Sequence, residues 1–204
     1  MKKNSLEFKI YKAIFSMLLI VAIVVAGMIV HKYICEYKNE KESQETIEAF
    51  SNIDFSDNKE KSQEQLEYKG YKVIGIVKIP KINIEYPILE IGNIDPENAK
   101  EPMKVSIIKY WGEKVNDYGN LSIAGHNNKS GTMFGKTKDL KNGDIVELTD
   151  LTGQTIQYSI YSIFVTDPND VSILLPKEEK IREVTLITCT NGNKQRLILK
   201  AREI

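Results

Sequence analysis

The pattern of hydrophobic and polar positions divides the chain into three stretches. Residues 13–30 form an uncharged, almost wholly apolar run that is about long enough to cross a bilayer as a helix. Residues 36–68 are rich in Glu, Lys, Ser, Gln and Asn and contain few apolar positions. From Gly70 onward, short apolar runs rich in β-branched residues alternate with polar turns. We therefore predict a membrane segment, a polar connector and one folded domain.

The folded domain is predicted to be mainly β with short helices. Runs at 72–79 and 82–89 are interrupted by Pro80 and Pro87, which is typical of sheet edges or barrel corners. Further strands are expected at 105–108, 119–125, 145–149, 155–165, 184–188 and 196–201, and short helices at 95–99, with Asp95 as N-cap, and at 132–140. Seven or eight short strands without regular β-α-β alternation favour a closed or nearly closed β-barrel.

The N-terminal residues predict how the apolar run is oriented in the membrane. Four lysines precede it, at Lys2, Lys3, Lys9 and Lys12. The positive-inside rule therefore places residues 1–12 in the cytoplasm and everything after His31 outside, although Lys32 and Lys38 reduce the contrast. A cleaved signal peptide is the alternative, but the run is long and no small-x-small cleavage site follows it. We interpret 13–30 as an uncleaved, single-pass signal anchor.

Residues 31–69 are interpreted as a polar stalk, partly helical or disordered, because such a composition cannot build a core. A coiled coil is the alternative, but sustained heptads are missing. His31 and Cys35 lie where the predicted helix leaves the membrane, and we interpret both as interfacial residues. Lipidation of Cys35 is disfavoured because Ile34 is bulkier than the small residue that a bacterial lipobox has there.

Composition excludes several classes of function. The 204 residues contain 28 basic and 28 acidic side chains, and this zero net charge argues against a nucleic-acid binder. Two cysteines and two histidines do not have zinc-site spacing, and no glycine-rich phosphate loop is present, so neither a metal nor a cofactor is expected. Four loop carboxylates are the candidates for a calcium site, and we interpret them as solvated surface charge: Glu113, Asp117, Glu178 and Glu179.

His126 and Cys189 are the candidate catalytic residues. Beyond the stalk they are the only histidine and the only cysteine, His126 follows the strand at 119–125, and Cys189 ends the strand at 184–188. A nucleophilic cysteine with a histidine base, if the chain has one, is therefore this pair. The alternative is structural, because a lone cysteine at the end of an apolar strand is usually a small buried hydrophobic residue.

The segment after Cys189 adds a cation to this pair. Asn191-Gly192 is a strong hairpin signal and leads into the strand that begins at Arg196. If the turn is centred between Gly192 and Asn193, Cys189 and Arg196 form a cross-strand pair on one face. A fixed cation beside a thiol favours the thiolate and can hold a developing oxyanion.

Together these motifs resemble the sortase family. The resemblance covers residues 70–204 and is carried by Ile79-Pro80-Lys81-Ile82, Ala124-Gly125-His126-Asn127, Lys141-Asn142-Gly143-Asp144 and Thr185-Leu186-Ile187-Thr188-Cys189 with the downstream Arg196. It implies a closed eight-stranded sortase-type β-barrel, the surface of a Gram-positive bacterium and cysteine transpeptidase chemistry. The predicted organisation is then a cytoplasmic N-terminus at 1–12, an anchor at 13–30, a stalk at 31–69 and a catalytic domain at 70–204.

The resemblance also implies a role for each residue. Cys189 would be the nucleophile, His126 the general acid/base, and Arg196 the residue that binds the substrate carbonyl and stabilises the oxyanion, with Thr188 supporting substrate binding. The substrates would be exported proteins with an LPxTG-like C-terminal sorting signal. A thioester on Cys189 would be resolved by an amine of a cell-wall precursor or of another protein. The partners are thus sorting-signal proteins, an amine acceptor and the membrane, but no nucleic acid.

The subclass and two alternative functions remain open at this point. Pilin-assembling sortases usually carry a second, C-terminal hydrophobic segment and an Asp-Pro-aromatic lid, whereas the two Asp-Pro steps here continue into Glu97 and Asn169. A single N-terminal anchor favours a class D-like enzyme, with class B as the nearest competitor. The alternatives are a membrane-tethered β-barrel binding module with a structural cysteine, and a plain cysteine peptidase.

Overall fold

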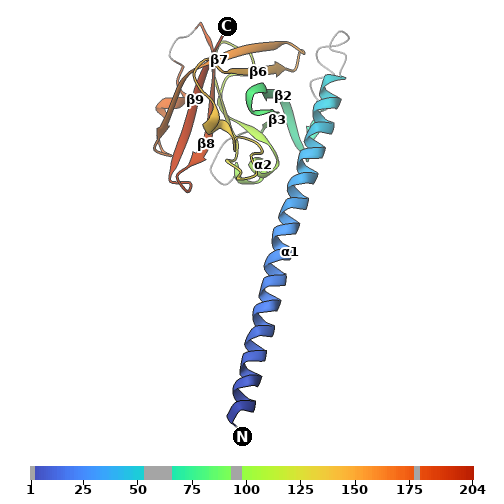
Figure 1. Cartoon of the computed structure of the whole chain (residues 1–204). Coiled ribbons are helices and arrows are strands. Elements are labelled where there is room, and N and C mark those ends of the chain that lie inside the picture. Colours follow the sequence, from blue (N-terminus) through green and yellow to red (C-terminus); the bar gives the residue numbers. More distant parts are fainter. Residues whose placement is uncertain (1–2, 53–65, 93–97, 177–179) are drawn as a thin grey trace. The chain divides into compact units, whose positions relative to one another are not determined.

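A computed structural model describes residues 3–52, 66–92, 98–176 and 180–204 of the chain. It contains two compact units, Met1–Glu42 and Ser43–Ile204. The first unit consists of most of the helix α1 (Lys3–Ser51), drawn in blue in Figure 1. The part of α1 from Leu6 is long and apolar enough to cross a membrane, and its most apolar stretch is not buried. The predicted segment 13–30 lies within this helix.

Eight strands of the described residues close into a barrel (Figure 1), as predicted. They are β2 (Tyr71–Ile79), β3 (Ile84–Glu90), β4 (Ile107–Gly112), β5 (Gly119–Ala124), β6 (Ile145–Asp150), β7 (Thr155–Thr166), β8 (Arg182–Thr190) and β9 (Gln195–Glu203). Their order is β2-β3-β4-β5-β8-β9-β7-β6, and pairing of β2 with β6 closes the ring. A two-residue strand, β1 (Glu67–Tyr68), adds to the edge of β2.

Two of the strand pairs are parallel, β3 with β4 and β5 with β8, and the other pairs are antiparallel. The connection from β3 to β4 includes the short helix α2 (Lys100–Val105). Because the carboxyl ends of parallel neighbours meet at the same edge, β5 and β8 both end at one end of the barrel. The segments that follow these two strands are therefore neighbours.

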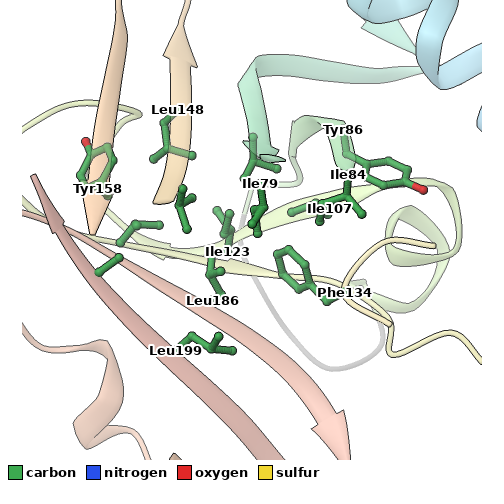
Figure 2. Packing of buried hydrophobic residues seen from close by; sticks show 14 of the residues in the cluster. Ile79, Ile84, Tyr86, Ile107, Ile123, Phe134, Leu148, Tyr158, Leu186 and Leu199 are labelled. Carbon is green, nitrogen blue, oxygen red and sulfur yellow. The ribbon is translucent and has the colours of Figure 1, made fainter. Parts of the chain in front are cut away.

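The barrel interior is filled by alternate residues of its strands. Ile123 of β5, Leu186 of β8 and Leu199 of β9 are fully buried in one cluster, which Figure 2 shows together with Ile79 and Leu148. Burial of each such side chain stabilises the fold by about 1.5–3 kcal/mol. Successive side chains of a strand point to opposite faces, so the residues between them lie on the outer face of the barrel.

The outer face of β5, β8 and β9 is also buried. Ala124, Ile187 and Ile198 belong to a second hydrophobic cluster. That cluster includes Ile173 of the 3₁₀ helix η3 (Ser172–Leu174) and is joined by Met103 of α2. The loop between β7 and β8 therefore packs on the outer face of the barrel.

Two predicted elements differ from the structure near the site. Residues 132–140 were expected to be helical, but only the 3₁₀ helix η2 (Thr137–Asp139) forms there. Met133 adopts a positive φ of 51°, which interrupts any helix. The strand expected at 105–108 starts instead at Ile107, because α2 extends to Val105. The helix start predicted at Asp95 lies outside the described residues.

The expected stalk differs as well. We predicted that residues 31–69 contribute nothing to a core, but Ile47 and Phe50 at the end of α1 are buried against Tyr68, Val73 and Ile76. Residues three apart share one face of a helix, so two apolar side chains suffice to make a narrow packing face. The helix therefore continues into the second unit, which begins at Ser43. Residues 53–65 of the expected stalk lie outside the described residues.

Candidate active site

The parallel pairing of β5 and β8 brings the backbones of His126 and Cys189 together. Ala124 of β5 is the register partner of Ile187 of β8. His126 follows Ala124 by two residues, and Cys189 follows Ile187 by two residues. The two candidate residues therefore lie at the same level, at the same end of the barrel.

The hairpin of β8 and β9 adds Arg196, as the Asn-Gly turn predicted. Cys189 and Arg196 are register partners across the antiparallel pair. The connecting turn contains Asn191, Gly192 and Asn193, which all have positive φ values, a conformation that favours Gly and Asn. The predicted cross-strand pair is thus confirmed.

All three candidate residues share the outer face of the barrel. Leu186 points inward on β8 and Leu199 points inward on β9, so alternation places Cys189 and Arg196 on the opposite face. The same alternation, continued beyond β5 from the inward Ile123, gives His126 that face too. The side chains of Cys189, His126 and Arg196 are each half-buried, which leaves them accessible to a substrate.

A glycine and a threonine fix the chain just before His126. A Cβ atom at Gly125 would lie only 3.0 Å from the ring of Phe134, so this position accepts no larger side chain without displacement. The buried hydroxyl of Thr188 donates a hydrogen bond of 2.8 Å to the carbonyl oxygen of Gly125. Thr188, which precedes Cys189, is thereby bonded to Gly125, which precedes His126.

The environment of His126 favours its neutral form. Burial lowers the pKa of the imidazole, and the positive charge of Lys104 on α2 lowers it further. A neutral imidazole can accept the proton of a thiol at neutral pH. Lys104 was missed in the sequence, where no motif marks a lysine that is distant from His126 in the chain.

The guanidinium of Arg196 is held by backbone carbonyl groups. Its Nη1 donates to the carbonyl oxygens of Asn193 and Gln195, each at 3.2 Å. No carboxylate among the described residues forms an ion pair with it. The cation beside Cys189 is thus uncompensated in this part of the chain, which is the arrangement needed to attract a substrate oxygen or a thiolate.

The other histidine and the other cysteine of the chain contact each other within α1. Cys35 and His31 are one helical turn apart on α1, with 3.7 Å between Sγ and Nε2. Glu113 and Asp117 belong to no group of three or more potential metal ligands within the described ranges. Glu178 and Glu179, and the Asp-Pro step before Glu97, lie outside those ranges.

Comparisons with known proteins match most of the folded domain. The family model described as "Sortase domain" matches residues 77–204. Sortase A of Staphylococcus aureus (strain NCTC 8325 / PS 47) is 29% identical over 192 residues, which cover 91% of this chain and 90% of that protein. Sortase D of Bacillus subtilis (strain 168) is 31% identical over 115 residues, which cover 56% of this chain and 53% of that protein.

A solved structure agrees with these relatives. The Clostridium perfringens Sortase D5 transpeptidase superposes with a TM-score of 0.63 at 31% identity, covering 82% of this chain and 99% of that one. Streptococcus pneumoniae Sortase C has a TM-score of 0.61 at 20% identity, which is a likeness of fold alone.

Proposed function

This chain belongs to the sortase family of cysteine transpeptidases, and we propose that it cleaves an LPxTG-like C-terminal sorting signal of exported proteins and transfers them to an amine of the cell wall. Membership of an enzyme family argues against the binding module with a structural cysteine. The observation that carries the proposal is the convergence of Cys189, His126 and Arg196 on one face at one end of the barrel.

The first half-reaction would form a thioester. The Sγ atom of Cys189, having given its proton to the neutral imidazole of His126, attacks the carbonyl carbon of the signal's Thr. The carbonyl oxygen becomes an oxyanion, and Arg196 stabilises it with the N–H groups that face the substrate. The C–N bond to the following Gly then breaks, and His126 returns the proton to the departing amine.

The second half-reaction would form the new amide bond. The nitrogen of the acceptor amine attacks the thioester carbonyl, and His126 takes a proton from this nitrogen. The C–S bond breaks, the Cys189 thiolate leaves and recovers the proton from His126, and the exported protein is joined to the acceptor. Thr188 would support the substrate by holding the segment before His126 in place.

We also infer the topology and the subclass. The lysines before residue 13 favour a cytoplasmic N-terminus, so that the catalytic domain at 70–204 would lie outside the cell, held by a stalk and a single membrane helix. The similarity to Bacillus subtilis Sortase D and to the Clostridium perfringens D5 enzyme is consistent with a class D-like enzyme. The similarity to Staphylococcus aureus Sortase A extends over 91% of this chain, so similarity to relatives does not by itself assign the class.

Mass spectrometry of the intact protein with a panel of sorting-signal peptides tests the proposal. We expect a thioester adduct on Cys189 with LPxTG-like peptides and no adduct on Cys189→Ala. Addition of an amine acceptor, such as a glycine peptide or a diamino acid, should convert the adduct to a ligated product. Hydrolysis alone with every amine would indicate the plain cysteine peptidase, and absence of any adduct would contradict the proposed substrate class.

A further inference from the structure

The segment after β5 departs from the ladder of β8 at the point where the site begins. The backbone N–H of Gly125 still donates to the carbonyl oxygen of Ile187, at 3.2 Å. In a parallel ladder the next donor would be the N–H of Asn127, and its acceptor would be the carbonyl oxygen of Cys189. Instead, the backbone of Asn127 forms a bridge with Met133, because the chain folds back on itself there.

The side chain of Asn127 takes the place of the missing backbone donor. Its Nδ2 donates a hydrogen bond of 2.8 Å to the carbonyl oxygen of Cys189. The loop that follows Asn127 turns away from β8. It returns at Phe134, whose N–H donates to the carbonyl oxygen of His126 at 3.0 Å. Strand β8 thus keeps a partner at the level of Cys189 although β5 has ended.

Hydrogen bonds hold the chain on both sides of His126. Before it, Gly125 is joined to Ile187 through its N–H and to Thr188 through its carbonyl oxygen. After it, Asn127 is joined to the backbone of Cys189 itself. The separation between the segments that carry the imidazole and the thiol is therefore set by contacts on both flanks, and of these contacts the one from Asn127 ends on Cys189 itself.

We propose that Asn127 is a positioning residue, whose side-chain amide holds His126 in register with Cys189 for proton transfer. The inference rests on the roles proposed above for these two residues. Proton transfer depends steeply on distance, and a displacement of about 1 Å can lower a rate by ~10²-fold. The Asn127 side chain is exposed, so loss of its bond should affect the fold far less than the rate, because water replaces the lost donor.

Asn127→Asp keeps the shape of the side chain but presents only acceptors to the Cys189 carbonyl, and Asn127→Ala removes the donor without adding a charge. Asn128→Ala is the matched control. It removes a bond of the same loop, from Nδ2 of Asn128 to Oγ1 of Thr132 at 2.9 Å, that does not reach β8. All variants are made in the full-length protein that carries Cys35→Ala. They are Asn127→Asp, Asn127→Ala, Asn128→Ala and His126→Ala.

The first measurement is steady-state cleavage of a sorting-signal peptide. We expect Asn127→Asp and Asn127→Ala to lower kcat by roughly 10- to 100-fold, with KM and the unfolding temperature nearly unchanged. Asn128→Ala should retain the parent kcat. A kcat of Asn127→Asp within about twofold of the parent, or an equal loss in Asn128→Ala, would overturn the proposal.

The second measurement needs no substrate, so it separates this inference from the proposed function. The pH dependence of Cys189 alkylation reports whether the thiol has an imidazole partner. We expect the profile of Asn127→Ala, which adds no charge, to move from that of the parent towards that of His126→Ala. A parent-like profile for Asn127→Ala contradicts the positioning role, whereas an unchanged profile for His126→Ala contradicts the catalytic pairing itself.

Discussion

At the scale of single residues, Arg196 differs from most surface arginines. Its Nη1 is bound by two backbone carbonyl oxygens of its own turn, and no carboxylate of the described chain neutralises it. The turn therefore orients the guanidinium plane, and the strand pairing sets its distance from Cys189. A function that depends on this geometry requires arginine and not merely a positive charge.

Arg196→Lys should therefore keep the fold and lose most of the rate. A lysine offers one compact charge on a flexible stem, which cannot replace a planar fork of donors. We expect a loss in kcat/KM on the order of 10²-fold, as on removal of an oxyanion donor. Peptide cleavage measures it, with circular dichroism as the control for folding. Turnover near the wild-type value would exclude a catalytic role for the Cys189–Arg196 pair.

Cys189 and His126 should behave as one unit. We expect Cys189→Ala and His126→Ala each to abolish turnover with little change in stability, because both side chains are half-buried at a strand end. The double variant should be hardly worse than either single variant, since each depends on the other. Cys35→Ala is the matched control and should be close to wild type. Substantial activity of Cys189→Ala would rule out the thioester.

Lys104 should influence the pH at which His126 titrates. Its charge disfavours the imidazolium and lowers the pKa, so Lys104→Gln should raise that pKa and move the acid limb of kcat/KM to higher pH. NMR titration can follow this directly, because His126 is the single histidine of residues 43–204. Lys100→Gln, on the same helix, is the control that should leave the titration unchanged. A shift to lower pH would contradict the assigned sign.

At the scale of elements, the end of α1 belongs to the folded domain. Ile47 and Phe50 cover Tyr68, Val73 and Ile76. Removal of the end of α1 would expose the apolar patch that these three residues form on the barrel. The stabilisation from burying Ile47 and Phe50 would be lost as well. The N-terminal boundary of a stable soluble domain is therefore nearer to Ser43 than to Gly70.

A soluble protein of residues 43–204 should accordingly be more stable than one of residues 66–204. With about 1.5–3 kcal/mol for each buried side chain, we expect a difference of roughly 3–6 kcal/mol in the free energy of unfolding. Urea denaturation of the two proteins measures it, with peptide cleavage as the check that both sites are intact. Equal stability would show that the helix end does not contribute to the fold in solution.

Local patterns predicted most strands and the hairpin register, but not the contacts between distant segments. The Asn-Gly turn was sufficient to align Cys189 with Arg196, because a short turn determines the register of its strands. The helix expected at 132–140 was wrong, because the positive φ of Met133 is incompatible with a helix through that residue. The link from Asn127 to Cys189 depends on the parallel pairing of β5 and β8, which no local pattern reveals.

The packing of the α1 end was missed for a different reason. Only Ile47 and Phe50 mark it, within a segment whose composition is otherwise typical of a solvated linker. Two apolar residues in a polar helix do not produce a recognisable amphipathic pattern. Their burial depends on an apolar patch that forms only when β2 has paired within the barrel.

At the scale of the whole molecule, the order of strands in space differs from their order in the chain. β9 follows every other described strand in sequence, yet in the sheet it lies between β8 and β7. Its neighbour β8 in turn joins β5, so the barrel is completed by strands that are distant in the chain. Pairings of this kind make folding slow compared with helical proteins of similar size.

This strand order has a consequence for the nascent chain during synthesis. A ribosome releases the segments of β2 to β7 before the residues of β8 and β9 emerge, and without those two strands the ring has a gap between β5 and β7. Cys189 and Arg196 lie on the missing strands, and His126 has no partner until they arrive. The three residues of the proposed site therefore come together only after the last strand, β9, has been synthesised and paired.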